Sequence, residues 1–273
     1  MKKLGTLSKM VVSHEAPVSY QLPLGEFLIP LDKYIGKDLA LEFTGEINCV
    51  ACGRDIKKSY QQGYCYPCTK KLAQCDMCIL KPEQCHYHLG TCREPEWGDT
   101  HCMIQHVVYL SNTSGIKVGI TRGTQVPTRW IDQGAIAAIP VFAVSTRRIS
   151  GLIESSLKSN ISDRTNWRNM LKNIVPEIDL IAEKHKLIDQ NQGLIADIIA
   201  EFGPGSAVAI HQDKVYEFEY PVLQYPEKVN SLSFDKTALV EGKLEGIKGQ
   251  YLIFSHGVIN MRKFGGYRVA LNT

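Results

Sequence analysis

Apolar and polar residues alternate in short runs at both ends of the chain. Residues 16–47 read APVSYQLPLGEFLIPLDKYIGKDLALEFTGEI, and residues 236–272 show the same pattern with glycines as turn points. Alternation with a period of two, broken by Gly and Pro, is typical of β-strands joined by tight turns. The sequence therefore predicts a small β-sheet or barrel piece at each end, and it leaves open whether the two pieces pair into one unit.

Between the two ends the pattern changes to mixed helices and strands. Residues 107–122, VVYLSNTSGIKVGITR, hold two short apolar runs separated by a polar turn with a glycine, which predicts a β-hairpin. A short helix is expected within residues 125–137 and a strand over 139–146. A second helix follows, because the next apolar residues recur with helical spacing: Ile149, Leu152, Ile153 and Leu157.

Two further helices are predicted toward the carboxyl end of this region. The carboxylate of Asp163 can cap the first, which covers RTNWRNMLKNI. The second is longer, has Pro176 in its first turn and is interrupted near Gly193.

The expected fold class is α+β, in a chain of 273 residues that is long enough for two or three domains. Its predicted parts are a β-rich N-terminal piece (1–48), a cysteine-rich metal-binding segment (49–104), an α+β domain with a helical extension (105–202) and a β-rich C-terminal unit (203–273). A hydrophobic content of 44% is that of an ordinary globular protein, and a net charge of +3 permits an acidic partner without requiring one.

The nine cysteines point to metal binding. The amino terminus, MKKLGTLSKMVVSHEAP, lacks the continuous apolar core of a secretory signal, and no segment has the ~18 uninterrupted apolar residues of a membrane span. We therefore expect a cytoplasmic protein that does not enter the membrane. In that reducing compartment an odd number of cysteines, all between Cys49 and Cys102, is better explained by metal than by disulfides.

Two CxxC pairs begin the cysteine-rich segment. Cys49 and Cys52 form the first pair, and Cys65 and Cys68 form the second, with twelve residues between the pairs. Each CxxC turn directs two thiolates at one point, so two such turns brought together supply the tetrahedral sulfur set that zinc prefers. The sequence predicts a zinc site here; buried cysteines without a metal are the alternative.

A second group has one cysteine more than a four-ligand site needs. Its members are Cys75, Cys78, Cys85, Cys92, Cys102, His86, His88 and His101. Cys102 adjoins the first strand of the next domain, so the predicted ligands are Cys75, Cys78, Cys85 and Cys92. Zinc is favoured, with an iron–sulfur cluster as the alternative, because thiolates suit both. Both metals are expected to hold together a segment that cannot bury a core of its own.

Four features follow one another between residues 105 and 173. They are VVY at 107–109, KVG at 117–119, Arg129 on the short helix and Glu154 in GLIESSLK. In this order they resemble the GIY strand, the YIG strand, the helix arginine and the metal-binding glutamate of the GIY-YIG nuclease superfamily. The whole chain is similar to an uncharacterised bacterial and archaeal family in which a cysteine-rich segment precedes a GIY-YIG-like domain. Asn166 is a candidate for the polar residue that closes such a site.

The resemblance implies a site that cleaves or binds a phosphodiester. Glu154 would hold a divalent ion such as Mg²⁺, which draws charge from the phosphate. Arg129, or alternatively Arg122, can bind two phosphate oxygens at once. Tyr109 can orient or deprotonate the attacking water if nearby cations lower its pKa. Lys117 stands where the superfamily has the first tyrosine of YIG, which preserves phosphate contact but puts water activation in question.

Each of these residues also has an ordinary structural interpretation. Tyr109 suits a half-buried strand position and Lys117 a solvent-facing one. Glu154 suits an exposed helix face, and Arg129 suits a surface ion pair. Val107 replaces the first glycine of GIY, a second departure from the superfamily. The joint order of the residues, rather than any one of them, supports the site.

Two more stretches are candidates for contacts with a ligand. MRKFGGYR, residues 261–268, mixes basic and aromatic side chains as single-strand binding surfaces do, although an exposed hairpin with solvated charges is the alternative. RWIDQGA, residues 129–135, lies outside the resemblance; Asp132 and Gln133 can bind a base or a metal, or Gly134 simply ends the helix. The predicted nucleic-acid contacts are Arg122, Arg147, Arg148, Arg262, Lys263, Tyr267 and Arg268, with Phe264 as a second aromatic residue.

The expected function is action on a nucleic acid, with RNA, including transfer RNA, preferred over DNA. The leading hypothesis is an endonuclease-like hydrolase with Tyr109, Lys117, Arg129 and Glu154 as its catalytic residues. Two alternatives stay open. One is a binding module whose nuclease site has decayed, and the other is a nucleic-acid modification enzyme that reuses the pocket. The substrate preference is an inference from the type of protein alone.

Overall fold

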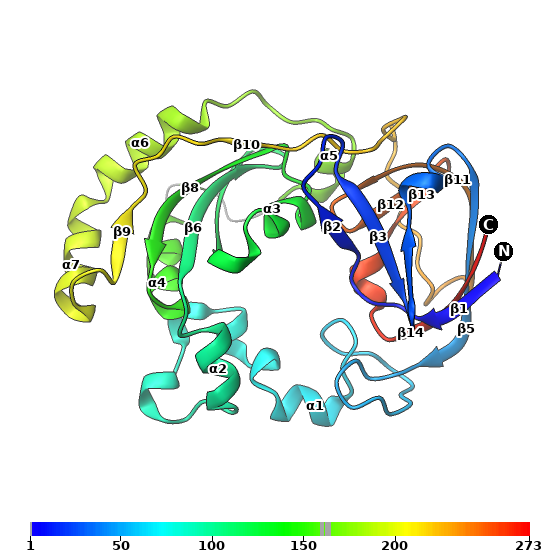
Figure 1. The fold of residues 1–273 in the computed structure, drawn as a ribbon, viewed down its shortest axis with the longest axis horizontal. Helices are drawn as coiled ribbons and strands as arrows, with labels where there is room; N and C mark the ends of the chain where they lie inside the picture. Colours follow the sequence, from blue (N-terminus) through cyan, green and yellow to red (C-terminus); the bar gives the residue numbers. More distant parts are fainter. Residues whose placement is uncertain (1, 159–160, 162–164) are drawn as a thin grey trace.

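The chain folds into three antiparallel β-sheets and a segment of short helices, which confirms the predicted α+β class. The computed structural model describes residues 2–158, 161 and 165–273. Figure 1 shows the strands of the two chain ends on one side, the central strands on the other and the cysteine-rich segment between them. Within these described residues, no helix combines the length and the apolar character that crossing a membrane requires.

The two ends of the chain form one six-stranded antiparallel sheet, in which β14 lies between β1 and β5. In sheet order its strands are β1 (Lys2–Thr6), β14 (Tyr267–Asn272), β5 (Asp38–Ile47), β11 (Leu239–Lys248), β12 (Tyr251–Phe254) and β13 (Gly257–Asn260). The termini therefore lie side by side (Figure 1). The β-rich pieces expected at the two ends pair into one unit, called here the terminal unit (residues 2–47 and 218–272).

A three-stranded sheet completes the terminal unit. It consists of β2 (Val11–Ser13), β3 (Ser19–Leu24) and β4 (Phe27–Pro30). Along β3, Tyr20, Leu22 and Leu24 are fully buried and alternate with half-buried residues, as the period-two pattern predicts. These side chains join a core with residues of the larger sheet, including Leu41 and Leu244. Two short 3₁₀ turns, Asp32–Tyr34 and Met261–Phe264, connect strands of the unit.

The middle of the chain forms a second antiparallel sheet, called here the central sheet. Its order is β10 (Tyr216–Glu217), β8 (Ala137–Val144), β6 (His106–Asn112) and β7 (Ile116–Arg122), and β9 (Ala207–Ala209) also pairs with β8. The hairpin expected over residues 107–122 is confirmed as β6 and β7. Every residue of β6 is buried, because Val108 and Leu110 belong to one core and Val107 and Tyr109 to the other. β7 is the edge strand.

Between β7 and β9 the described residues form five helices: α3 (Thr128–Asp132), α4 (Arg147–Leu157), α5 (Trp167–Leu171), α6 (Leu180–Gln190) and α7 (Gln192–Phe202). Met170 and Leu171 of α5 pack against Ile253 and Val258 of the terminal unit. Ile149 and Ile153 of α4 pack against the sheet, as the helical stripe predicts. Asn166 caps α5, and Asp163, the expected cap, lies outside the described residues. The long helix starts after Asp179 rather than at Pro176, because the Asp179 carboxylate accepts hydrogen bonds from two backbone N–H groups at 3.0 Å.

The cysteine-rich segment (residues 49–104) consists of short turns of helix that dock on α4. Its elements are α1 (Tyr66–Lys71), the 3₁₀ turns Ala73–Cys75, Met77–Ile79, Pro82–Gln84 and Tyr87–Leu89, and α2 (Pro95–His101). At Gly151 the contact is so close that an added Cβ would lie 2.5 Å from the backbone nitrogen of Glu83. Arg147 donates from its Nη2 to the Ile79 carbonyl at 2.7 Å, and its backbone N–H donates to the Cys102 carbonyl at 2.8 Å.

The boundary predicted at residue 203 differs from the structure. Residues 207–217, which the sequence assigns to the C-terminal unit, form β9 and β10 of the central sheet. The two units are also joined by a shared core and by Tyr220, whose hydroxyl donates to the Ala135 carbonyl at 2.7 Å. A boundary drawn from local composition misses these strands because both are short and their pairing partner, β8, is distant in the sequence.

Candidate functional site

The first four cysteines come together as expected. The sulfur atoms of Cys49, Cys52, Cys65 and Cys68 all lie within 4.8 Å of one another, and those of Cys52 and Cys65 are 3.8 Å apart. A tight turn with Gly53 at a φ of 71° places the first pair, and the start of α1 places the second. Four convergent thiols and no other ligand type suit a metal such as zinc.

Backbone N–H groups stabilise the thiolate form of Cys49. Burial alone would raise the pKa of its thiol, but the N–H groups of Cys52, Cys65 and Ala51 point at the sulfur and lower the pKa to about 6. The N–H of Cys65, for example, donates to the Cys49 Sγ at 3.2 Å. Amides that favour a thiolate also favour a thiolate bound to metal.

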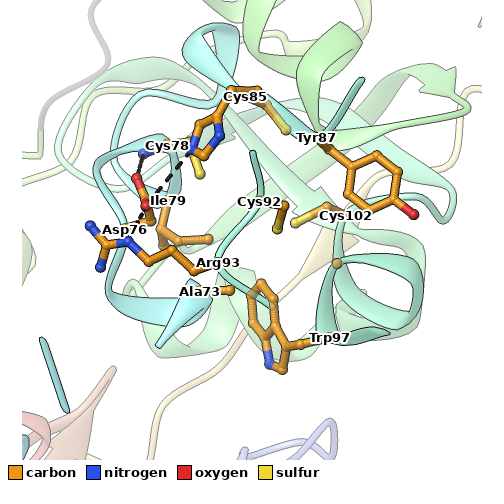
Figure 2. Close-up of a pocket in the computed structure, with 12 residues that line it drawn as sticks. Ala73, Asp76, Cys78, Ile79, Cys85, Tyr87, Cys92, Arg93, Trp97 and Cys102 are labelled. Carbon is orange, nitrogen blue, oxygen red and sulfur yellow. Dashed lines mark hydrogen bonds and ion pairs between the residues drawn. The ribbon is translucent and has the colours of Figure 1, made fainter. Parts of the chain in front are cut away.

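The second cysteine group differs from the predicted set. Figure 2 shows one small pocket lined by Cys78, Cys85, Cys92 and Cys102. Cys75 is absent from the lining of this pocket. The lining therefore differs from the predicted ligand set, which had Cys75 in place of Cys102. Spacing along the chain could not show it, because α2 turns the chain back before Cys102 is reached.

A cavity of about 640 Å³ follows the edge strand β7 and is bounded by the central sheet, the cysteine-rich segment and the terminal unit. Its lining includes nine charged side chains: Lys9, Lys117, Arg122, Arg129, Arg147, Lys158, Arg262, Asp132 and Glu154. We call it the cationic cavity. All four predicted catalytic residues line it: Tyr109, Lys117, Arg129 and Glu154. They come from β6, β7, α3 and α4 in turn.

Tyr109 lies at the inner wall of the cationic cavity. Its side chain is only 1% exposed, and its hydroxyl donates to the Gln133 Oε1 at 2.9 Å. The Trp130 ring meets the phenol edge to face, with 5.5 Å between the ring centres. Burial raises the pKa of Tyr109, although Arg129 acts in the opposite direction. Tyr109 is therefore suited to orient or donate a hydrogen bond rather than to remove a proton.

Lys117 and Tyr109 share one face of the hairpin. Tyr109 pairs with Gly119, and Lys117 is two residues from Gly119 along β7, so its side chain leaves the strand on the same side. Lys117 is 6% exposed, and it is not the solvent-facing strand lysine that was the alternative. The cationic cavity is the surface that remains open to it.

Positive charge exceeds negative charge in the cationic cavity. Of the carboxylates among the described lining residues, Asp132 forms an ion pair with Lys9 and accepts a hydrogen bond from Gln250 at 2.9 Å. The Glu154 carboxylate lies 3.5 Å from the Lys158 ammonium. Burial lowers the pKa of Arg262, and the nearby Arg129 guanidinium adds to the effect. Two arginines that repel each other favour an anionic ligand between them.

A family model described as "Protein of unknown function (DUF2797)" matches residues 36–269. The chain belongs to the DUF2797 family. The match includes both cysteine groups and every residue of the cationic cavity apart from Lys9. No curated protein matches this DUF2797 chain, and no solved structure does either.

The basic stretch at residues 261–268 of this DUF2797 protein does not form the expected stacking surface. Phe264 is fully buried in the core of the terminal unit, and Tyr267 is 6% exposed with its hydroxyl bound to the Asp235 carboxylate at 2.7 Å. The prediction that Tyr267 and Phe264 stack on bases is therefore wrong, because neither ring has a free face. Lys263 and Arg268 form ion pairs, with Asp235 and Glu46 respectively.

The other predicted contacts divide into two sets. Arg122, Arg147 and Arg262 line the cationic cavity. Arg148 does not, since its guanidinium lies over the Phe202 ring at 5.3 Å and helps to hold α4 against α7. Asn166, the candidate for closing the site, accepts a hydrogen bond from the Asn169 N–H and is absent from the described lining of the cavity.

The stretch RWIDQGA of this DUF2797 chain joins the two units and also supports the site. Asp132 is tied to the terminal unit through Lys9 and Gln250, and Gly134, with a φ of 73°, ends α3. Gln133 holds Tyr109. Sequence reasoning missed Lys9 and Lys158; only Lys158 carried a signal, because it lies four residues after Glu154 on the same helix.

Proposed function

We propose that this protein acts on a nucleic acid by binding its phosphate backbone in the cationic cavity, where a GIY-YIG-like site cleaves or holds one phosphodiester. The observation that carries the proposal is the shared lining of one cavity by Tyr109, Lys117, Arg129 and Glu154. Residues far apart in the sequence rarely converge with an excess of cations without an anionic ligand. RNA, including transfer RNA, is the preferred substrate class.

The cationic side chains have distinct tasks in this proposal. Arg129 binds two oxygens of the phosphate with its planar guanidinium, and Arg262 lines the same cavity. Lys117 supplies a compact charge from the edge strand. Tyr109, held by Gln133, donates a hydrogen bond toward a phosphate or an attacking water. Chain segments on either side of the reacting phosphate would follow the outer cations of the cavity.

Glu154 is the residue suited to hold a divalent ion. Its side chain is 13% exposed and lines the cavity next to Lys158, and the other lining carboxylate, Asp132, is held by both Lys9 and Gln250. One carboxylate with several waters is a common way to hold Mg²⁺. When bound, such an ion offsets charge on the phosphate and the leaving oxygen. The raised pKa of Tyr109 is a reason not to assign proton removal to the phenol.

A non-catalytic binding module is the second candidate. Its support is the burial of Tyr109 and the lysine at position 117, because neither side chain is an evident base for activating water. The hypothesis of a modification enzyme rested on Asp132 and Gln133 as ligand contacts, and it is weakened because both side chains have hydrogen-bond partners within the protein.

We propose the cytoplasm as the location of the protein. None of the nine cysteines forms a disulfide, which suits that reducing compartment.

Cleavage of a panel of RNA and DNA substrates with Mg²⁺ tests the proposal. Glu154→Gln should lower cleavage by roughly 100-fold or more, while binding persists. Glu201→Gln is the matched control, since Glu201 is exposed on α7 and lies outside the cavity. Binding that requires Arg129, without cleavage of any substrate by the unmodified protein, would favour the binding module. A protein that binds neither RNA nor DNA would overturn the proposal.

A further inference from the structure

We propose that Cys78, Cys85, Cys92 and Cys102 form a second zinc site, closed and structural, that fastens the cysteine-rich segment to the central sheet. The four side chains line one pocket, in which the Cys92 and Cys102 sulfurs lie next to each other (Figure 2). Its interior is only about 10 Å³, room for a single ion and no further ligand. Structural zinc sites have this closed arrangement, with four thiolates and no open position.

The backbone around the pocket is arranged to hold the four sulfurs. Cys85 follows the 3₁₀ turn Pro82–Gln84, and the Cys78 N–H donates to the Asp76 carboxylate at 3.3 Å. Cys102 follows α2, where its N–H donates to the Gly98 carbonyl at 2.7 Å. Gly98 permits this approach, because a Cβ there would lie 3.0 Å from the Tyr87 ring and 3.6 Å from the Cys92 sulfur. Helix α2 thus returns Cys102 to the three earlier cysteines.

A buried cation next to the pocket supplies an independent observation. The Arg147 guanidinium interacts electrostatically with Cys78 and Cys102. Its Nη2 also donates a hydrogen bond to the carbonyl of Ile79, the residue after Cys78. Its Nε is buried and has no hydrogen-bond partner among the described residues. Four thiolates around one Zn²⁺ leave a net negative charge, so a neighbouring guanidinium stabilises the loaded site.

Two other ligand sets fit less well. Cys75 does not line the pocket, and burial raises the pKa of its thiol. Asp76, Cys78 and His86 also have ligand atoms within 4.8 Å of one another. However, Asp76 is held by Arg93 at 2.5 Å and accepts a hydrogen bond from the Cys78 N–H, and the His86 Nδ1 is hydrogen-bonded to Thr91 at 2.8 Å. This set offers a single thiolate, whereas the pocket offers four, and closed structural zinc sites are rich in thiolates.

The second zinc site would connect the cysteine-rich segment to the walls of the cationic cavity. Cys102 comes four residues before β6, and Arg147 is the first residue of α4, so one ion would connect the segment to two elements that wall the cationic cavity. The first group lies at the other end of the segment, beside β5. Two ions would therefore fasten the segment at both ends.

Zinc content and zinc-edge X-ray absorption of the full chain, purified without added metal, test the proposal. The unmodified protein should contain two zinc ions per chain, each with four sulfur neighbours. Cys75→Ser is the decisive variant: if it retains both ions with all-sulfur coordination, the remaining eight cysteines are all ligands, and Cys102 is among them. This inference does not depend on whether a Cys102 variant folds.

Further variants separate the competing sets. Cys102→Ser should retain one zinc ion, and Asp76→Asn should retain two. A single zinc ion in the unmodified protein would overturn the proposal, and so would loss of one ion in Cys75→Ser. Iron with the visible absorbance of an iron–sulfur cluster would overturn the assignment of zinc.

Discussion

The phenol of Tyr109 lies directly against the backbone of Gly119 on the neighbouring strand. The two residues pair in the β6–β7 register, and a Cβ at position 119 would lie 2.6 Å from the Tyr109 hydroxyl oxygen. The glycine of KVG is therefore required by the tyrosine of VVY. The two short motifs of the hairpin are one structural unit, and Gln133 of α3 completes it by accepting the hydroxyl hydrogen bond.

Gly119→Ala should destabilise the protein by about 1–3 kcal/mol, because the added methyl group forces the phenol out of a packed site. Chemical denaturation measures the loss. In a background that carries Tyr109→Ala the same substitution should cost much less, since the clashing atoms are gone. Equal costs in both backgrounds would show that Tyr109 does not occupy this position in solution.

Arg129→Ala should weaken nucleic-acid binding by roughly tenfold and reduce the salt dependence by about one phosphate contact. The reason is the loss of one guanidinium from the cationic cavity. Binding isotherms at several salt concentrations provide the measurement. Lys263→Ala is the control, because Lys263 pairs with Asp235 outside the cavity and should leave the slope unchanged.

Cys52→Ser should release one metal ion and loosen the start of the cysteine-rich segment. The loop between the two CxxC pairs has little core of its own, so its order depends on the ion. Hydrogen exchange should accelerate for amides near Cys49 and Cys65, including the N–H that points at the Cys49 sulfur. Amides of β8 serve as the internal reference. Unchanged exchange near the cysteines would contradict a structural role for the ion.

His106 should make the protein less stable as the pH falls. Burial lowers the pKa of this imidazole from 6.5 to about 4, with its Nδ1 bound to the Ile104 carbonyl at 2.8 Å. Between these two pH values His106 is protonated in the unfolded chain but neutral in the folded chain. The free energy of unfolding that is present above pH 6.5 therefore declines toward pH 4. From pH 7.5 to pH 5.5 this loss is about 1 kcal/mol. The loss should be absent from the stability curve of His106→Gln, measured by denaturant unfolding.

Sequence determined the features that depend on neighbours along the chain. The spacing of two CxxC turns was enough to identify the group of Cys49, Cys52, Cys65 and Cys68, because each turn fixes the direction of its own thiols. The two-residue period of a strand placed Lys117 on the same face as Gly119, and hence beside Tyr109. Helical spacing likewise identified the buried side of α4.

Tertiary structure decided everything that required distant segments to meet. The set of cysteines that lines the second pocket depended on how α2 turns the chain back, and the rings of Phe264 and Tyr267 were buried against Phe234 from another part of the chain. Lys9 and Arg262 reach the cationic cavity only because the two chain ends form one sheet. Local propensity and residue spacing do not predict these contacts between distant segments. The free energy of such contacts comes from burying surfaces that are far apart in the sequence.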